Sequence, residues 1–382
     1  MQAIDKAETI VIVGGGSIGL STAYNLARKQ EESNGKKVVV LEALNEPFGA
    51  TSGSCTGCLH YKFRGRDSDK LADLGKYSFE LWQALSSNPD FRTAVGYRPH
   101  CFFELNPGTG AGLENLPNWF EPDTRWDTDL KVLRSPNAMV NPRGVGPWLA
   151  NECRRLGVDI RLGATLTSVE LTSSNTVKSV TYSKDGTLKK LGCRSLVIAA
   201  GPWTPTLYST LFPSSLIRLE SALNAGDWLL FRNPFPVTDQ SIAFIALDGI
   251  VGEKLEFAGR EDGTIWLIGR KDYNTSLPPL GESAKPDPSL VEELTDRAKE
   301  YLRRGCRADH QFCETVEIIG TGRGIRPAAS SLLPIISQVK GKDIADSVDD
   351  PVESSGVLGQ LILGETPDID VALFDIGRDR IL

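Results

Sequence analysis

The hydrophobic pattern near the amino end changes from a β-branched run to glycines and then to a helix. Ile10–Val13 has the composition of a buried parallel strand. The stretch GGGSIGLSTAYNLA that follows predicts a tight turn leading into a helix. A second apolar run, Lys37–Leu41, predicts the next strand. The chain therefore opens with a predicted strand–helix–strand unit.

Two further helices are predicted from their apolar spacing and their end signals. Leu71–Leu85 carries an apolar stripe at helical spacing, which indicates a core helix. Pro142 after Asn141 is a helix-start signal, and the helix is expected to run to about Leu156, before Gly157. Between these helices, residues 98–136 carry prolines and aromatic residues in short pieces, and we expect an irregular cap there.

Strands dominate the rest of the pattern. After the second helix, the expected strands are Asp159–Leu162, Leu166–Leu171, Val177–Ser183 and Leu196–Ala200. From about residue 216 to 312, alternating strands predict an antiparallel sheet with one covered face. Its expected elements are the strands Trp228–Phe231, Ala243–Leu247 and Thr264–Ile268, and a helix over about Ser289–Arg304. A further strand is expected at Glu314–Ile319. The module that begins with the strand–helix–strand unit and the module of the antiparallel sheet are therefore expected to be interleaved along the chain.

Composition and charge narrow the class of protein. The 382 residues are 40% hydrophobic and 24% charged, which is typical of a globular protein with a sizeable core. A net charge of −7 argues against partners such as nucleic acid or anionic membranes. No apolar run is long enough to span a membrane, and neither an apolar signal core nor a Ser-Lys-Leu ending is present. We therefore expect a cytoplasmic protein.

The glycine spacing in the first turn gives the first indication of chemistry. Gly14, Gly16 and Gly19 match the G-x-G-x-x-G pattern, in which backbone and helix dipole approach a pyrophosphate. Glu42 ends the second strand about 20 residues past the last glycine, where an acid binds a ribose hydroxyl. The sequence therefore predicts a dinucleotide site, against the alternative of a structural turn with no ligand.

The cysteines do not indicate a metal site. Cys55 and Cys58 have C-x-x-C spacing with His60 nearby, but no second pair completes a zinc site. Thiols that only pack are the favoured interpretation, and a redox dithiol remains open. We therefore predict no metal.

Four motifs in this order resemble the D-amino-acid oxidase (DAO) family of FAD-dependent oxidoreductases, which includes glycine and sarcosine oxidases. The motifs are VIVGGGSIGLSTAYNLA with VVVLEA, the loop GATSGS, VNPRGVGPWLANECRRLGVDIRLGATLTSV, and LVIAAGPWT with GRGIRP. The resemblance covers residues 9 to about 336, with a fragment at Val357–Gly364. It implies an α/β fold in which a Rossmann-like FAD-binding domain is interleaved with an antiparallel-sheet α+β substrate domain. The implied FAD-binding parts are 1–80, 137–215 and 313–382, and the substrate parts are 81–136 and 216–312.

The same resemblance implies non-covalent FAD as the cofactor, because Arg326 stands near the position where sarcosine-oxidase-type members carry the flavin-linking cysteine. The implied FAD contacts are Gly14, Gly16, Ser17, Ile18, Gly19, Glu42, Ala43, Ala50, Thr51, Ser52, Gly53, Leu166, Ala200, Gly201 and Trp203.

Arg326 in GIRP is the implied clamp for a substrate carboxylate, since a guanidinium can bind a carboxylate through two hydrogen bonds. Arg323 has a weaker claim, and His60 is a further catalytic candidate because it follows the flavin loop. The implied reaction is oxidation of the C–N bond of an amino acid or secondary amine by hydride transfer to flavin, with O₂ as the acceptor. An ion pair at Arg326 and a local structural role for His60 remain the alternatives.

The closing part of the chain departs from the family pattern. Residues 337–355 are polar and contain five acids against Lys340 and Lys342. The family's glycine–histidine turn and second glycine helix start are absent from the sequence. Two other functions therefore stay open: a flavoprotein fold that serves as a binding or regulatory module, and an NAD(P)H-dependent flavoenzyme.

Overall fold

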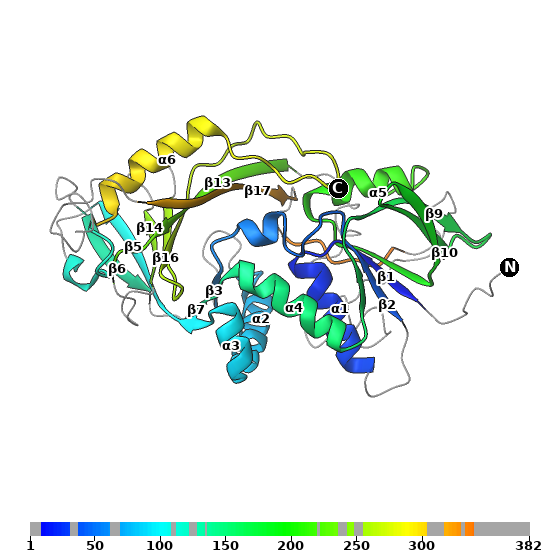
Figure 1. Ribbon diagram of the computed structural model, residues 1–382, viewed down its shortest axis with the longest axis horizontal. Helices are drawn as coiled ribbons and strands as arrows, with labels where there is room; N and C mark the ends of the chain where they lie inside the picture. The colour runs from blue at the N-terminus through cyan, green and yellow to red at the C-terminus, as the bar shows by residue number, and fades with distance from the viewer. Residues whose placement is uncertain are drawn as a thin grey trace.

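The computed structural model describes most of the chain as two sheet-based halves placed side by side (Figure 1). The described residues are 9–30, 37–61, 69–107, 112–121, 128–133, 136–219, 222–235, 243–247, 255–303, 317–329 and 333–339. Within these ranges, every helix is too short or too polar to cross a lipid bilayer.

A four-stranded parallel sheet forms the core of one half, as predicted. Its order is β12 (Ser195–Ile198), β1 (Ile10–Val13), β2 (Val38–Leu41) and β8 (Asp159–Arg161). Every residue of β1 and β2 is buried, which explains why these strands are continuous apolar runs. The helix α1 (Ser17–Gln30) connects β1 to β2 and confirms the predicted strand–helix–strand unit.

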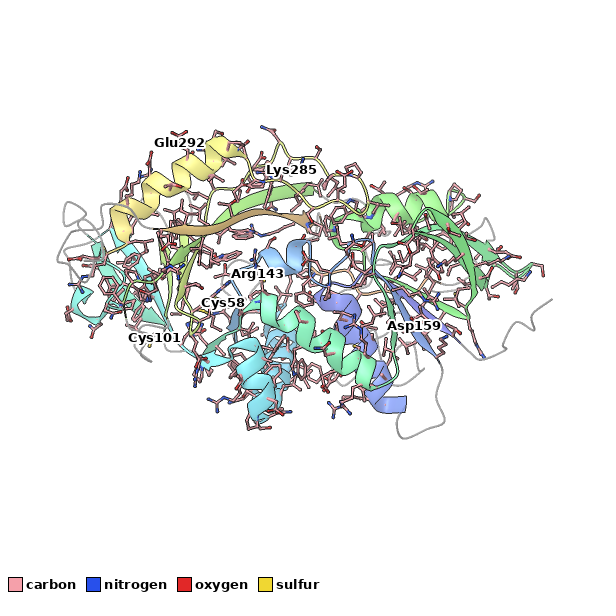
Figure 2. The ribbon with its side chains drawn as sticks, viewed as in Figure 1. Cys58, Cys101, Arg143, Asp159, Lys285 and Glu292 are labelled. Carbon is pink, nitrogen blue, oxygen red and sulfur yellow. The ribbon has the colours of Figure 1, made fainter. Side chains whose placement is uncertain are left out.

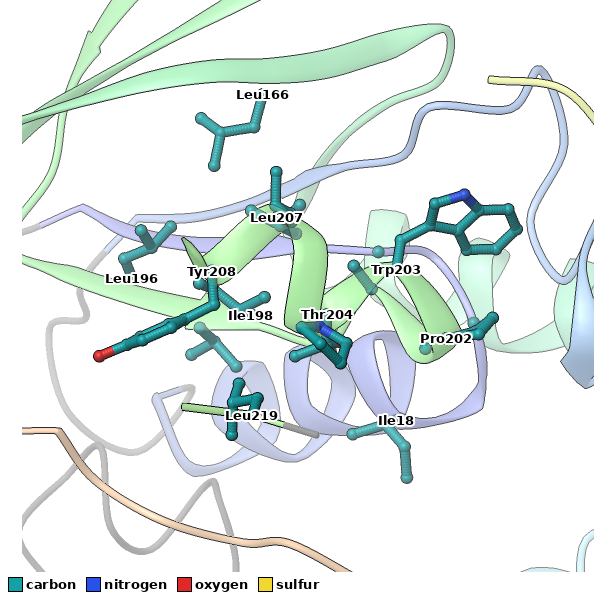
Figure 3. A pocket seen from close by; sticks show the side chains of 18 of the residues that line it. Ile18, Leu166, Leu196, Ile198, Pro202, Trp203, Thr204, Leu207, Tyr208 and Leu219 are labelled. Carbon is teal, nitrogen blue, oxygen red and sulfur yellow. The ribbon is translucent and has the colours of Figure 1, made fainter. Parts of the chain in front are cut away.

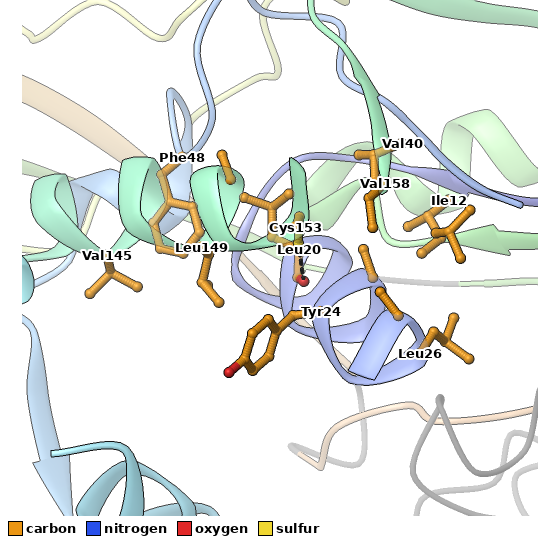
Figure 4. Close-up of a cluster of buried hydrophobic side chains, with 14 of the residues drawn as sticks. Ile12, Leu20, Tyr24, Leu26, Val40, Phe48, Val145, Leu149, Cys153 and Val158 are labelled. Carbon is orange, nitrogen blue, oxygen red and sulfur yellow. Dashed lines mark hydrogen bonds between the residues drawn. The ribbon is translucent and has the colours of Figure 1, made fainter. Parts of the chain in front are cut away.

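Helices cover one face of this sheet. The helix α4 (Pro142–Arg155) begins as predicted, because Asn141 caps it and Pro142 occupies its first position. It packs against α1, and Figure 4 shows the Cys153 thiol reaching the Leu20 carbonyl at 3.6 Å. The buried side chains of this cluster include Leu20, Tyr24, Leu26, Val145, Leu149 and Cys153. The helices α2 (Ala72–Leu85) and α3 (Pro89–Val95) extend this layer.

The other face of the parallel sheet packs against a three-stranded antiparallel sheet. It is formed by β9 (Ala164–Leu171), β10 (Val177–Lys184) and β11 (Thr187–Gly192), of which only β11 lacks a counterpart in the sequence prediction. The chain then returns through β12 into the one-turn helix η3 (Gly201–Trp203) and α5 (Thr204–Leu211).

A seven-stranded sheet forms the second half. Its order is β17 (Ile318–Ala328), β13 (Ala222–Arg232), β16 (Thr264–Ile268), β15 (Leu255–Gly259), β14 (Ala243–Leu247), β5 (Cys101–Pro107) and β6 (Thr128–Leu133). All neighbours are antiparallel except the parallel pair β14–β5. The helix α6 (Pro288–Tyr301) covers one face with a buried cluster that includes Leu294 and Tyr301. The predicted covered antiparallel sheet is therefore confirmed, with one parallel pair added.

The prediction of an irregular cap over residues 98–136 is wrong in part. This stretch supplies β5 and β6 to the large sheet, and β4 (Arg98–Pro99) to a small sheet with β3 (Cys58–His60) and β7 (Asn137–Met139). A short 3-10 turn, η2 (Leu113–Asn115), is also found there. The strands were missed because β5 is completed by β14, which is more than 130 residues away and leaves no local signal.

β17 connects the two halves. It forms ten register pairs with β13, although the predicted domain limits assign its residues to the FAD-binding domain. Those limits remain a prediction. The strand predicted at Glu314–Ile319 is described only from residue 317, and β17 begins at Ile318. Of the closing segment, residues 340–355 lie outside the described residues, as does the fragment Val357–Gly364.

Candidate functional site

A cavity of about 930 Å³ lies where the strands β1, β2 and β12 end (Figure 3). Most of the predicted cofactor residues line it, although they come from five separate parts of the chain. These residues are Gly14, Gly16, Ser17, Ile18, Glu42, Ala43, Ala50, Thr51, Ser52, Leu166, Ala200, Gly201 and Trp203. Gly19 and Gly53 are not among the lining residues. The carboxyl ends of parallel strands are the usual place for a ligand in such a fold.

The glycines at the entrance of α1 are required by close backbone approach. Gly14 has φ +107°, and a Cβ atom there would lie 2.3 Å from the Ala199 carbonyl oxygen. A Cβ on Gly19 would lie 1.9 Å from the Gly14 carbonyl oxygen, so Gly19 allows helix and strand to pack. Gly19 therefore supports the site through this packing, without itself lining the cavity.

The amino end of α1 offers a positive pole to the cavity. No acidic residue stands in its first turn, although the Glu42 carboxylate binds the Gly15 amide two residues before the helix begins. The Ser17 amide donates to the Ser52 hydroxyl oxygen at 3.0 Å, which fixes the predicted loop against the helix. That loop forms the short 3-10 helix η1 (Thr51–Ser54). An anionic group in the cavity would meet the helix N-terminus and these hydroxyl groups.

Glu42 lies at the carboxyl end of β2, as the sequence predicts. Its carboxylate accepts hydrogen bonds from the Gly15 amide and, at 2.7 Å, from the Leu44 amide. Burial raises the pKa of Glu42, while these backbone hydrogen bonds oppose the rise. The side chain is thereby oriented at the cavity edge, with lone pairs left for a ligand hydroxyl.

Sequence reasoning missed part of the cavity wall. Leu207 and Tyr208 of α5 contribute apolar surface, as Figure 3 shows. Leu280–Glu282, from the loop before α6, and Leu333–Val339, after β17, complete the lining. In the latter segment the Ser337 hydroxyl is buried and has no hydrogen-bond partner among the described residues. Only tertiary packing brings these segments to the cavity, so no local pattern could have revealed them.

Arg323 and Arg326 lie on opposite faces of β17, because successive strand residues alternate. Arg323, with a side chain 9% exposed, forms salt bridges with Asp227 and Asp272. Asp227 is 1% exposed, and burial raises its pKa against the opposing effects of the Asp287 amide and the Arg323 charge. Arg323 is thus a structural ion-pair residue.

Arg326 faces the inner side of the sheet, in register with Asn224 of β13. The Arg326 guanidinium donates to the Asn224 side-chain oxygen at 3.3 Å. Among the described residues, no carboxylate lies within salt-bridge distance of it. Its positive charge is therefore available to a ligand, which is the arrangement that the carboxylate-clamp prediction requires.

The cofactor loop and the arginine strand are in direct contact. The Thr51 hydroxyl donates to the Ile325 carbonyl oxygen at 2.6 Å, and the Ser54 hydroxyl to the Arg323 carbonyl oxygen at 3.4 Å. A Cβ on Gly324 would lie 2.9 Å from the Ser54 Cβ atom. The predicted cofactor loop is therefore in contact with the strand that carries Arg326, although Arg326 itself is not among the residues that line the cavity.

The face of the large sheet that carries Arg326 also carries two stacked tryptophan side chains. Trp228 and Trp266 stack with their ring centroids 4.5 Å apart. Arg143 lies over the Trp228 ring and Arg260 over the Trp266 ring. Burial lowers the pKa of Arg260 to about 10, so it stays charged at neutral pH. Figure 2 shows Arg143 between the two halves.

His60 lies apart from Arg326, in the small sheet. Its Nδ1 atom is 2.8 Å from the Asn137 side-chain oxygen, and its ring packs edge-on against Phe102. Neither His60 nor Arg326 is among the residues that line the cavity. The surroundings of His60 fit a local structural role, and its catalytic role stays a prediction.

Neither cysteine of the C-x-x-C pair forms a disulfide with a described residue. The Cys55 thiol donates to the Ser52 carbonyl oxygen at 3.3 Å, and Cys58 packs against a buried cluster. Although Cys55 reaches solvent, the surrounding protein desolvates its thiol and raises its pKa. Across the described part of the chain, no three His, Cys, Asp or Glu side chains gather as a metal would require.

Comparison with known proteins decides the family. Residues 9–355 match the family model described as DAO, FAD dependent oxidoreductase. The chain belongs to this family. The predicted family, fold class and cofactor, FAD, are therefore confirmed.

Relatives agree with this assignment. The chain is 23% identical over 331 residues to the protein C1F5.03c of Schizosaccharomyces pombe, covering 81% of this chain and 83% of that protein. Glycine oxidase from Geobacillus kaustophilus has the same fold, with a TM-score of 0.69, 15% identity, and coverage of 97% of this chain and 99% of the oxidase. L-proline dehydrogenase from P. horikoshii matches with a TM-score of 0.70, 14% identity and coverage of 98% of both chains.

Proposed function

We propose that this FAD-dependent oxidoreductase oxidises the C–N bond of an amino acid or a secondary amine that carries a carboxylate. The observation that supports this most directly is the charge environment of Arg326, whose only partner in the described part of the chain is the neutral Asn224 side chain. A guanidinium that lacks a counter-ion can form two parallel hydrogen bonds with a substrate carboxylate. The solved structures of the same fold include an oxidase of glycine and a dehydrogenase of L-proline, both amino acids.

The cavity fits FAD in size and in the chemistry of its lining. Its wall combines the amino end of α1, the Glu42 carboxylate and the apolar surface beside Leu166. We propose that α1 and η1 hold the pyrophosphate, that Glu42 accepts from ribose hydroxyls, and that β9 covers the adenine at Leu166. The unpartnered Ser337 hydroxyl supplies one further donor at this wall.

The cofactor and the protein have different roles in the proposed reaction. Bound FAD supplies the hydride acceptor. The chain holds the substrate: Arg326 fixes its carboxylate, and Asn224 limits the orientations of Arg326. Because η1 contacts β17, a substrate held by Arg326 would lie beside the cofactor loop. We propose non-covalent FAD, since Arg326 takes the position of the linking cysteine, and O₂ as the electron acceptor.

Flavin reduction tests this function. The purified protein is mixed anaerobically with D-amino acids, N-methyl amino acids and cyclic imino acids, and the loss of flavin absorbance is followed. We expect bleaching by a carboxylated amine and, after air is admitted, return of colour with formation of peroxide. Arg326→Lys should weaken substrate binding, while the exposed Arg155→Lys serves as the matched control.

Three outcomes would contradict the proposal. Colourless protein that takes up no added FAD would favour a binding or regulatory module, which the unusual sequence of residues 337–355 leaves open. Bleaching by NADPH without an amine would favour an NAD(P)H-dependent flavoenzyme. Unchanged kinetics of Arg326→Lys with a carboxylated substrate would remove Arg326 from the site.

A further inference from the structure

The loop between β16 and α6 belongs to the large sheet but reaches the cofactor cavity. Residues 269–287 contain no helix or strand, and Figure 1 shows this yellow segment running from the large sheet toward α5 and back to α6. We call residues 278–283, at its far end, the strap. Leu280, Gly281 and Glu282 of the strap line the cavity, together with the glycine turn and Glu42, which are far from them in the sequence.

Both ends of the loop are fixed to β13. Asp272 and Ala225 exchange two backbone hydrogen bonds, at 2.8 and 2.9 Å. Arg323 binds the Asp272 carboxylate, and the Asp287 amide donates to the Asp227 carboxylate at 3.0 Å. The ion-pair cluster of Arg323, Asp227 and Asp272, to which β17 contributes Arg323, therefore holds the loop against the sheet. Prolines at 278, 279 and 286 further restrict its conformations.

The strap also contacts the FAD-binding half directly. The Trp203 indole N–H donates to the Pro278 carbonyl oxygen at 3.0 Å, and the Ser283 hydroxyl to the Gly49 carbonyl oxygen at 3.4 Å. A Cβ atom at Gly281 would lie 3.4 Å from the Ala43 carbonyl oxygen, an ordinary van der Waals distance, so the strap backbone runs beside Ala43. Two hydrogen bonds to different segments thus hold the strap at one edge of the cavity.

Leu280 at the tip of the strap is 43% exposed although it is a large apolar residue. Two other exposed apolar side chains, Ile18 at 58% and Ile335 at 43%, line the same cavity. Exposed apolar surface that gathers around a cavity marks a surface that a ligand covers.

We propose that the strap, through Leu280, forms the outer wall of the FAD site and sets the rate at which FAD dissociates. This inference rests on the proposal that FAD occupies the cavity, but it does not depend on the substrate. Since the strap is anchored in the large sheet, the substrate-binding half of the protein would contribute directly to cofactor retention.

The dissociation rate of FAD tests the strap in the holoenzyme. After dilution of the FAD-loaded protein, the recovery of flavin fluorescence gives the rate. Leu280→Ala should release FAD about tenfold faster, because contact with two or three apolar groups is lost. The cofactor-free variant should melt close to the wild-type temperature, because Leu280 is already 43% exposed when the cavity is empty.

The matched control is Tyr273→Ala, which changes a residue of the same loop that is 67% exposed and does not line the cavity. Its FAD release should equal that of the wild type. Trp203→Phe removes the indole N–H bonded to Pro278 and should raise the rate about fivefold, which also tests the strap if Leu280→Ala does not fold.

Two results would overturn the inference. In the first, Leu280→Ala and Trp203→Phe both release FAD at the wild-type rate while amines still bleach the flavin. This result would contradict the role of the strap and leave the proposed function unchanged. The other is wild-type protein that binds no FAD, which would also overturn the cofactor site. Faster FAD release without any reduction by amines would instead support the strap and contradict the proposed substrate class.

Discussion

The two faces of β17 carry arginines three residues apart, and their surroundings differ in kind. On the outer face, Arg323 is neutralised by two carboxylates that also hold the loop before α6. On the inner face, Arg326 has an amide oxygen as its only partner among the described residues. The same residue type is thus part of the scaffold on one side and available to a ligand on the other. The difference comes from the neighbouring charges, which a motif containing both arginines does not reveal.

The largest expected effect is on stability, at Arg323. Arg323→Met leaves Asp227 buried without its counter-ion, and we expect the free energy of unfolding to fall by about 3–5 kcal/mol. Denaturant unfolding measures the loss. The double variant Arg323→Met with Asp227→Asn should recover part of it, and a double variant as unstable as the sum of both single changes would contradict the ion-pair interpretation.

His100 extends the comparison to a partly buried ring that forms no salt bridge with any described residue. Its Nδ1 atom lies 2.8 Å from the Cys101 carbonyl oxygen, Nε2 is buried with no hydrogen-bond partner in the described part of the chain, and burial lowers the pKa of His100 to about 4. Because the unfolded chain takes up this proton first, stability should be constant above pH 6.5 and fall by at most about 3 kcal/mol as the pH decreases toward 4. Melting temperatures of the wild type and His100→Asn across this range measure the effect. Equal pH dependence in both proteins would refute it.

Arg326 should affect binding and leave stability nearly unchanged. Lysine cannot form the two parallel hydrogen bonds that a guanidinium forms with a carboxylate. For Arg326→Lys we therefore expect KM for a carboxylated substrate to rise about tenfold or more, equivalent to about 1.5 kcal/mol. Substrates that lack a carboxylate should be unaffected. Steady-state kinetics with both classes gives the answer, and a large drop in melting temperature would place Arg326 in the scaffold with Arg323.

Asn224 should show the smallest effect. Asn224→Ala removes the oxygen that restrains the Arg326 guanidinium, so KM should rise about threefold, as for the loss of less than one net hydrogen bond. In the Arg326→Lys background the same change should have little further effect, because the two residues act through one contact. Independent, additive losses would show that Asn224 acts by another route.

Local sequence signals predicted the parts of the structure that local sequence determines. The unit from Ile10 to Leu41 followed from a buried apolar run and from glycines required by close backbone contacts. The α4 start followed from Asn141 and Pro142, which cap the helix regardless of its partners. Most predicted cofactor residues also line one cavity, because the motifs that carry them lie at strand ends.

Tertiary pairing determined what the sequence left open. The glycines of GTGRGIRP weaken any strand signal, so the opposite faces of Arg323 and Arg326 could not be assigned before β17 was seen beside β13. Likewise, β5 pairs with β14 across a long sequence separation. The prolines of residues 278–286 indicate a loop, but only the packing of Trp203 and Ala43 shows that it covers the cavity.

The contact between Gly324 and Ser54 has a consequence for how this scaffold can diversify. At that point the two halves meet with no room for even a methyl group, so their separation cannot be adjusted there. Gly226 lies opposite Gly324 on β13, and a side chain there would first meet only the tips of Ile268 and Arg326. Substrate size could therefore be tuned at position 226 by filling space next to the guanidinium, while the spacing between cofactor loop and sheet stays constant.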